Sequence, residues 1–477
     1  MSAAAPPSSA PPRRRWRRFA GLAAALLCVL AVTLGWLLAS EGGLRAAVRL
    51  ATWASGGQLQ FVDVRGRVLG PLSIAELRFE SAAQRFIVRE LATDWQPAAL
   101  LQRRLHVDRL QMAELRLATA PDPDAGPLEL PRTLRLPLAL EVGRLQVGRV
   151  VVEAWPVAAD AAPQFLVEAL SGALRSDAHS HVVTDLELQL PAVTVTVDAL
   201  SLAVDPPYAL AATGGLQGSH EEREFAARFS LAGDLAEPQL ALQASGAGLS
   251  GELQLHATPF AAVPLRSLQL ALSGLDPAAF HAAAPHALLR LEARLAGVAG
   301  EHGGDWALTG TLAGDNAVPG AIDGGQLPLE RFSSALRWEA GHVGVHDMAL
   351  VLAGGDRVAG SVQWIGDAEA APVAAHREDA LRGRVDAALT LQGVDPARVR
   401  GDWPALPIDG VIEARAEGVQ QSAQLRLQTA GARLEAELTV DGGAAVTRFE
   451  ASARLREVVP QRFLAAAPAG KLGLDVE

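Results

Sequence analysis

The chain has 477 residues, of which 49% are hydrophobic and 20% are charged, and its formal net charge is −11. Five of its 42 Lys and Arg residues lie within the first 18 positions, so 37 basic residues face 53 acidic ones in the remainder, a net charge of −16 there. A surface this acidic argues against nucleic acid as a partner. The single cysteine, Cys28, leaves no disulfide and no cysteine metal site to hold the fold together.

The N-terminus is predicted to be a disordered, basic cytoplasmic tail over residues 1–18, followed by a transmembrane signal anchor over residues 19–39. Residues 19–38 carry no charge, and twenty helical residues span a hydrocarbon core about 30 Å thick. The anchor residues are Phe19, Leu26, Leu27, Leu30, Leu34, Trp36 and Leu37, and the topology is set by Arg13, Arg14, Arg15, Arg17 and Arg18. A cleaved signal peptide is the alternative, but residues 37–40 offer no good small-x-small pair for cleavage.

A short amphipathic helix is predicted within residues 40–57. Ser40 is a suitable N-cap for a helix over residues 41–54, which Gly56 and Gly57 would end. Leu44, Val48 and Ala51 would then share one side of it, where they could join the anchor to the structure that follows.

Strands are predicted from residue 58 to residue 477. These residues repeat one pattern. In each copy, two apolar residues are separated by one residue, a spacer of two residues follows, and then come two more apolar residues separated by one residue. The period of two predicts β-strands with one apolar face, and a bulge or bend has to absorb the extra residue if that face is to persist. The residues expected to line this face are Leu72, Ile74, Leu77, Phe79, Leu105, Val107, Leu110, Met112, Leu115, Leu117, Leu140, Val142, Leu145 and Val147. The predicted fold is all-β, a long, curled, repeating sheet of antiparallel type that forms a groove (a β-taco).

Short helices are predicted to interrupt this sheet. Pro97 suits the first turn of one of them. An Asp-Pro pair, in which Asp caps a helix that Pro begins, occurs at Asp276-Pro277 and again at Asp395-Pro396, and a weaker copy surrounds Pro460. A further proline follows each copy by eight residues. The repeat is therefore quasi-regular, and since no capping element is evident near residue 477, we expect the chain to be the N-terminal part of a longer protein.

Catalytic and metal-binding patterns are weak. His179 and His181 with Asp177, and His342 and His346 with Asp347, are residue types that bind metals, but solvated strand or loop faces explain both groups more simply. No nucleotide-binding loop, nucleophile elbow or zinc-protease helix is present in the sequence. We therefore expect neither an enzyme nor a cofactor.

The opening of the chain resembles a known family. The matching residues are Ser40-Glu41-Gly42-Gly43-Leu44-Arg45, Gly57-x-Leu59, Val64-x-Gly66-x-Val68-Leu69-Gly70-x-Leu72, Leu91-x-x-Asp94-Trp95-x-Pro97-x-x-Leu100-Leu101 and Leu105-x-Val107-x-x-Leu110. With the arginine-flanked anchor, they resemble the N-terminal region of the TamB family, the translocation and assembly module proteins, within the AsmA-like group of bridge proteins. The first 110 residues carry the specific part of this resemblance, whereas the strand repeats are generic.

The resemblance implies a single-pass protein of the bacterial inner membrane, with most of its mass in the periplasm. It implies a hydrophobic groove for phospholipid transport to the outer membrane, and a role in translocation and assembly of outer-membrane proteins with a TamA-type barrel. The family's C-terminal domain, which meets that barrel, does not occur in this sequence.

The residues by themselves leave three interpretations open. An apolar groove could carry phospholipid acyl chains. Alternatively, the sheet could be a scaffold or chaperone whose strand edges pair with nascent barrel proteins, or a closed β-solenoid whose apolar stripe is only a core. On length alone, about 420 residues at roughly twelve per strand give on the order of 35 strands and roughly 150 Å of sheet.

Overall fold

The structure is a computed structural model that describes residue 35 and residues 39–121, 128–157, 163–220, 223–246, 248–279, 284–302, 306–366, 383–442, 448–459 and 470–476. The predicted tail and almost all of the predicted anchor, including each named arginine and anchor residue, lie outside these described residues. Among the residues that are described, none of the helices combines the length and the apolar character needed to cross a bilayer.

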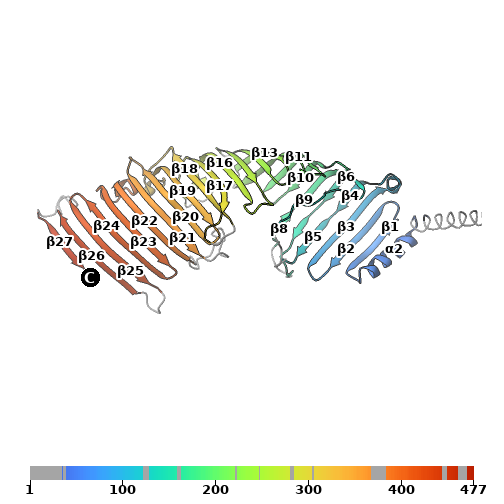
Figure 1. Ribbon diagram of the computed structural model, residues 1–477, viewed down its shortest axis with the longest axis horizontal. Coiled ribbons are helices and arrows are strands. Elements are labelled where there is room, and N and C mark those ends of the chain that lie inside the picture. Colours follow the sequence, from blue (N-terminus) through green and yellow to red (C-terminus); the bar gives the residue numbers. More distant parts are fainter. Residues whose placement is uncertain are drawn as a thin grey trace, which may run out of the picture. The chain divides into compact units, whose positions relative to one another are not determined.

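The predicted N-terminal helix is present as α2, Glu41–Ala54. Ser40 is its N-cap, and the Ser40 hydroxyl accepts a hydrogen bond from the Gly43 amide at 3.1 Å. Gly56 and Gly57 follow with φ of 63° and 84°, a left-handed conformation that ends the helix. Leu44 is 5% exposed because α2 packs against the first strand, next to which it lies in Figure 1.

The described residues are all-β apart from short helices, and they divide into two compact units. Unit 1 comprises residues 1–125 and 133–205, and unit 2 comprises residues 126–132 and 206–477. The strands of unit 1 are β1 Leu59–Gly66, β2 Leu72–Glu80, β3 Gln84–Gln96, β4 Arg104–Met112, β5 Glu114–Thr119, β6 Ala139–Val147, β7 Val150–Val152, β8 Phe165–Val167, β9 Ala169–Ser176, β10 Ser180–Gln189 and β11 Val193–Ala203.

Unit 1 departs from the predicted antiparallel arrangement at two strand pairs. β4 and β5 continue one another, and both pair antiparallel with β3. β6 then pairs with β4 in parallel, and β7 pairs with β5 in parallel. A tight turn reverses a strand, whereas the long connection 120–138 returns the chain to the beginning of β4, so the next strand runs in the same direction.

The strands of unit 2 are β12 Leu210–His220, β13 Arg223–Gly233, β14 Pro238–Gly246, β15 Leu249–Ala257, β16 Leu265–Leu275, β17 Leu289–Ala299, β18 Trp306–Asn316, β19 Leu329–Glu339, β20 His342–Leu352, β21 Arg357–Gly366, β22 Gly383–Val394, β23 Ile408–Glu417, β24 Gln420–Thr429, β25 Ala432–Asp441, β26 Arg448–Val458 and β27 Leu472–Val476. Each pairs antiparallel with the next.

This order makes the sheet of unit 2 an open meander, as Figure 1 shows for the strands coloured from green to red. A closed solenoid stacks its rungs in parallel, so the described strands of this unit do not form one. The estimate of about 35 strands was too high. The structure describes 27, because many strands run to 10 or 11 residues and the connections between some of them are long.

The predicted short helices appear where proline begins them. A 3-10 helix, η1, spans Pro97–Gln102, another, η2, spans Pro277–Ala279, and α3 spans Pro396–Val399. The carboxylates of Asp276 and Asp395 each accept the amide hydrogen two residues ahead, at 3.1 and 3.2 Å. The first two Asp-Pro copies therefore share the capping hydrogen bond, although one begins a 3-10 helix and the other an α-helix. The copy at Pro460 lies outside the described residues.

Candidate functional site

The fourteen predicted lining residues lie on one face of unit 1, because the strand register aligns them with one another, either directly or through a shared partner on β3, which for Leu72 and Leu110 is Thr93. The four on β4 pair with the four on β6: Leu105 with Leu140, Val107 with Val142, Leu110 with Leu145, and Met112 with Val147. On β2, Leu77 and Phe79 pair with Val88 and Phe86 of β3. Leu115 and Leu117 of β5 pair with the same two residues from the other side.

A line of kinks crosses this face where the alternation slips. Asp63 in β1, Glu90 in β3 and Asp185 in β10 have φ near 50°, which side chains rarely adopt inside a strand. Asp63 of β1 and Glu90 of β3 both lie opposite Ala75 of β2. Ala75 is left unpaired in the register with β1 and in the register with β3. Along β1–β3 each strand bends at this point without a change of register, whereas an extra residue is absorbed by a bulge between Val142 and Leu145 of β6 and between Thr184 and Glu187 of β10. The expectation of a bulge or bend is thus confirmed, and the apolar residues stay on one face across the slip.

Burial differs along this face. Ile74, Val107, Val142 and Val147 are 5 to 8% exposed, whereas Leu117 is 37% exposed. The remaining predicted lining residues are half-buried. Part of the apolar face of unit 1 therefore resembles a packed core, and part of it is accessible from outside.

Unit 2 has a longer apolar face, which the sequence-based list of lining residues did not include. One row of directly paired residues crosses fifteen consecutive strands, and we call it the central row. It contains Ala212, Leu231, Leu240, Leu255, Leu268, Leu295, Gly310, Leu336, Val345, Val362, Ala387, Ala414, Ala423, Leu438 and Ala451. None of its members has a polar side chain, and most are half-buried.

The neighbouring row on the opposite face is polar. Between β12 and β18 it contains Thr213, Ser230, Ala241, Gln254, Gln269, Arg294 and Thr311. The same alternation that identified the lining residues of unit 1 is present in these strands, for example at Leu240 and Leu242 of β14. The sequence signal was therefore available, but only the register aligns the strands into a continuous row.

Small residues hollow the apolar face near the end of unit 2. A depression of about 200 Å³ is lined by Val385, Ala387, Ala414, Ala416, Ala423, Leu438 and Val440, with Arg415, Gln421 and Ser422 also contributing. Ala387, Ala414 and Ala423 are successive members of the central row. Because alanine leaves the space that leucine fills elsewhere in the row, this region has room for a hydrocarbon segment.

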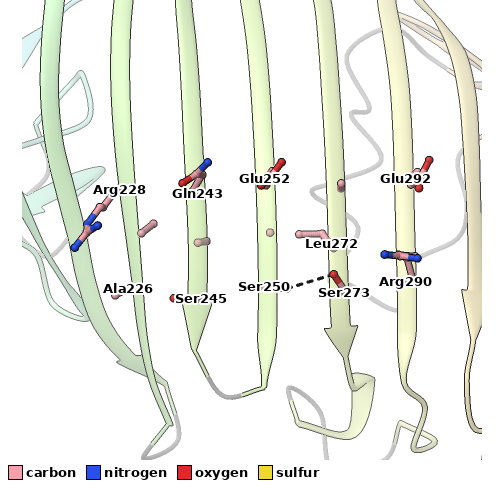
Figure 2. Close-up of a pocket in the computed structure, with 14 residues that line it drawn as sticks. Ala226, Arg228, Gln243, Ser245, Ser250, Glu252, Leu272, Ser273, Arg290 and Glu292 are labelled. Carbon is pink, nitrogen blue, oxygen red and sulfur yellow. Dashed lines mark hydrogen bonds between the residues drawn. The ribbon is translucent and has the colours of Figure 1, made fainter.

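A larger depression, of about 690 Å³, lies on the polar face of β13–β17 and is shown in Figure 2. Ser245, Ser250 and Ser273 form one row in register, and the hydroxyls of the last two are 3.3 Å apart. Arg228 and Arg290 lie towards its two ends. Its walls suit water and polar groups, and they do not suit an apolar ligand.

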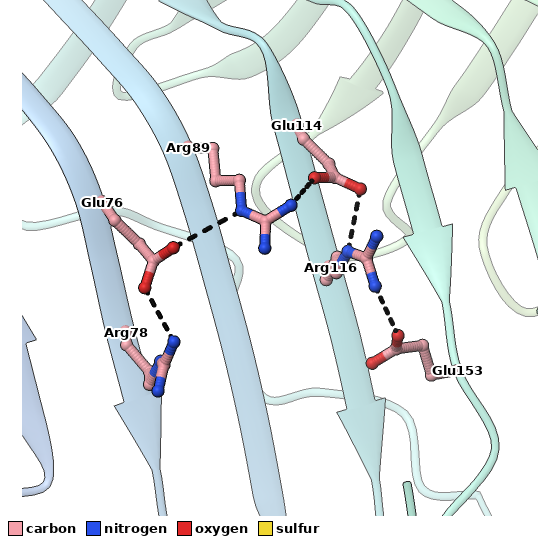
Figure 3. Close-up of polar contacts among 6 residues, drawn as sticks. All are labelled: Glu76, Arg78, Arg89, Glu114, Arg116 and Glu153. Atoms are coloured by element: carbon pink, nitrogen blue, oxygen red, sulfur yellow. Dashed lines mark hydrogen bonds and ion pairs between the residues drawn. The ribbon is translucent and has the colours of Figure 1, made fainter. Parts of the chain in front are cut away.

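The polar face of unit 1 carries a ladder of ion pairs (Figure 3). Glu76 binds Arg78 at 2.8 Å and Arg89 at 3.4 Å, and Arg89 also binds Glu114 at 2.6 Å. Arg116 continues the ladder, at 2.8 Å from Glu114 and 3.1 Å from Glu153. Since these contacts join β2, β3, β5 and the residue after β7, they reinforce the part of the sheet where the parallel pairing begins.

Glu114 is the centre of this ladder. Burial raises the pKa of the Glu114 carboxyl, but hydrogen bonds and charges from Arg116 and Arg89 outweigh burial, so that its pKa lies below the ordinary value. The Glu114 hydrogen bond likewise raises the pKa of Arg116. Glu114 and Arg116 are consequently both charged at neutral pH.

The histidine groups do not come together as a metal centre. In the described part of the chain, no three His, Cys, Asp or Glu residues are arranged to hold a metal ion. The His181 ring contacts the Ser176 hydroxyl at 2.7 Å and the Leu134 carbonyl oxygen at 2.9 Å, so both its nitrogens have structural partners. His342 stacks on His302, with ring centroids 4.8 Å apart.

Comparison with known proteins adds no further constraint: neither a family model, nor a curated protein, nor a solved structure matches this chain.

Proposed function

We propose that this protein is a bridge of the TamB type, in the AsmA-like group, which is anchored in the bacterial inner membrane and carries phospholipid on its apolar face through the periplasm to the outer membrane. The central row of unit 2 is the observation that supports this proposal most strongly. The row takes one residue from each of fifteen strands, and none of these fifteen residues has a polar side chain. It therefore gives an acyl chain a continuous apolar surface. The half-buried state of most of its members keeps that surface accessible.

The energetics favour such a surface. A two-chain phospholipid has about 30 methylenes, and at about 0.8 kcal/mol each their transfer into water costs roughly 20 kcal/mol or more. An apolar face removes most of this cost. Inside the sheet, the paired strands satisfy their backbone hydrogen bonds with one another, so that backbone polar groups are not presented to the hydrocarbon there.

The polar groups of the molecule are compatible with this role. The polar row beside the central row and the ion-pair ladder of unit 1 lie on the other face of the strands, where they keep the sheet in water. Gln421 is a polar residue that the register places on the apolar face, opposite Ala416 and Val440. The acidic net charge of the chain suits an exported, water-filled compartment. A role in translocation and assembly of outer-membrane proteins, with a TamA-type barrel, is part of the proposal through the resemblance of the first 110 residues.

Site-specific photocrosslinking tests the lipid proposal. A benzophenone side chain would replace Leu255 of the central row, and as a matched control it would replace Gln254, the next residue of β15, whose side chain is on the polar face. In cells, lipid adducts are expected at position 255 and not at position 254. Equal adducts at both positions, or none at position 255, would refute an apolar lipid path.

A charge in the central row tests transport itself. Leu255→Glu is expected to stop lipid movement between donor and acceptor membranes, because a carboxylate inside a hydrocarbon path costs several kcal/mol. Gln254→Glu adds the same charge to the same strand and is expected to transport normally. Circular dichroism of both variants checks that the sheet is intact, and transport by an intact Leu255→Glu variant would contradict the proposal.

The scaffold function is the second candidate, and it has an observation of its own. β1 pairs only with β2 among the described strands, and its residue Val62 is 54% exposed. Exposed apolar strands can add a further strand by backbone pairing. Cysteine crosslinks from this strand to a barrel protein, with no lipid adduct at Leu255, would favour the scaffold.

A further inference from the structure

Helix α2 has apolar side chains on two opposite sides. Leu44 is buried against the sheet at 5% exposure. On the other side, Leu50 is 62% and Trp53 is 79% exposed, and the exposed residue Ala46 precedes them. Positions 46, 50 and 53 follow the i, i+4, i+7 spacing of one helix face, so they form a ridge that no described part of the chain covers.

Basic residues border this ridge. Arg49 is exposed and makes no hydrogen bond or ion pair within the described residues, and Arg45 makes one exposed pair with Glu41 at 3.7 Å. A helix with Trp and Leu on one face and arginine beside them is typical of segments that lie in a membrane interface. An isolated exposed leucine would carry no such meaning, but the spacing and the arginines make this ridge distinct.

The length of the chain places the helix at the membrane. Only two residues separate Leu38, the last residue of the uncharged segment, from Glu41. At about 3.8 Å per residue, Glu41 lies at most about 11 Å from Leu38. The headgroup layer on each side of the hydrocarbon core is itself about 5 to 8 Å thick.

We propose that α2 lies flat in the outer headgroup layer of the membrane that anchors the chain, with Ala46, Leu50 and Trp53 in the acyl boundary and Arg45 and Arg49 at the lipid phosphates. The buried side of α2 packs on β1, so the first strands of unit 1 stand directly at the bilayer surface. Phospholipid leaving the bilayer meets the apolar face of β1–β3 without crossing water. This inference rests on the proposed function, because it takes residues 19–38 as the anchor.

Fluorescence quenching in membranes tests it with the full chain. Cys28→Ser removes the only cysteine, and single cysteines at Leu50 or Ala46 then carry an environment-sensitive dye in reconstituted vesicles of zwitterionic and anionic phospholipid. Nitroxides near the top of the acyl chains are expected to remove most of the dye emission at both positions. A dye at Asp198, an exposed residue of β11, is the matched control and is expected to keep its emission.

The outcomes separate this inference from the transport proposal. A dye at Leu50 as water-exposed as the one at Asp198 overturns the interfacial position. A dye that is shielded from water but not quenched by lipid nitroxides also overturns it, because protein would then cover the ridge. If Leu50 is quenched while lipid adducts at Leu255 are absent, the interfacial helix stands and the transport function fails. If lipid adducts form at Leu255 but the dye at Leu50 is not quenched, the transport function stands and the interfacial helix fails.

A charge-reversal variant tests the arginines. Arg45→Glu with Arg49→Glu keeps the apolar side chains on both sides of the helix, although it replaces the exposed Arg45–Glu41 pair by like charges, and it repels lipid phosphates. Quenching at Ala46 is therefore expected to fall well below that of the parent chain. The matched pair of charge reversals at Arg454 and Arg456, exposed residues of β26, is expected to leave quenching unchanged. Undiminished quenching in the helix variant would contradict the contact with phosphate.

Discussion

The two units build an apolar face in different ways. In unit 1, strands are split and kinked, two pairs are parallel, and four of the lining side chains are nearly inaccessible. In unit 2, the sixteen described strands follow one another in an antiparallel meander, which has kinks of its own at Asp347 and Glu457, and most of the central row is half-buried. The difference teaches that one binary pattern is compatible both with a partly packed face and with an accessible one, and that the pattern by itself does not fix how the strands pair.

A charge in the buried part of unit 1 should have the largest effect. Val142 is 6% exposed and pairs with Val107 and Leu174, so Val142→Asp is expected to destabilise unit 1 by more than about 3 kcal/mol. Leu425→Asp, in the half-buried face of unit 2, is expected to cost about 1 to 2 kcal/mol, since its carboxylate can still reach water.

Hydrogen exchange in urea, measured separately for peptides of β6 and of β24, checks the contrast. Equal destabilisation by the two variants would show that the faces are packed alike. Loss of protection in both units from Val142→Asp alone would show that they unfold as one body.

The ion-pair ladder should matter more than a single exposed charge of unit 2. Glu114 is largely shielded and contacts two arginines, so Glu114→Ala is expected to lower the stability of unit 1 by about 1 to 3 kcal/mol. Glu435→Ala, at an exposed position of β25, is expected to change stability by less than about 0.5 kcal/mol. Denaturant midpoints of both variants provide the measurement. Equal shifts of the two midpoints would show that the ladder does not stabilise unit 1 more than an exposed charge stabilises unit 2.

Acid should weaken the ladder in a defined direction. The folded-state pKa of Glu114 lies below its ordinary value of 4.5, so its stabilising contribution is complete above that pH and is lost as pH falls through the folded pKa. The stability of unit 1 is therefore expected to decline from about pH 4.5 downwards, and to decline less in Glu114→Gln. Urea titrations across this pH range test the sign of the change in stability. If acidification raised the stability of the parent chain but not that of Glu114→Gln, the predicted direction would be wrong.

The smallest expected effect concerns the proline-initiated helices. Asp395 caps α3 with its carboxylate, whereas Gln96 gives η1 no side-chain cap. Asp395→Ala is expected to cost about 1 kcal/mol, and Gln96→Ala less than half of that. Local hydrogen exchange after each helix is the measurement. A larger loss at Gln96 would mean that its amide contact with Asp108 at 3.1 Å outweighs a helix cap.

The sequence by itself determined the local elements of this protein. Alternation at Leu105 and Val107 predicted strands with one apolar face, Ser40 and Gly56 predicted both ends of α2, and Pro97 and Asp395 predicted short helices, because each signal acts within a few residues of the chain. Even the kinks were predictable, since the two residues between Val142 and Leu145, Gly143 and Arg144, leave no other way to keep both apolar side chains on one face.

Only the tertiary structure decided how the strands meet. The parallel pairing of β6 with β4 depends on where the connection 120–138 leads, and the central row of unit 2 depends on the registers of many strand pairs in succession. The exposure of Leu50 and Trp53 likewise depends on the side of α2 that the sheet occupies. Pairing partners and covered surfaces are properties of distant segments in contact, and the local spacing of residues along a chain does not specify them.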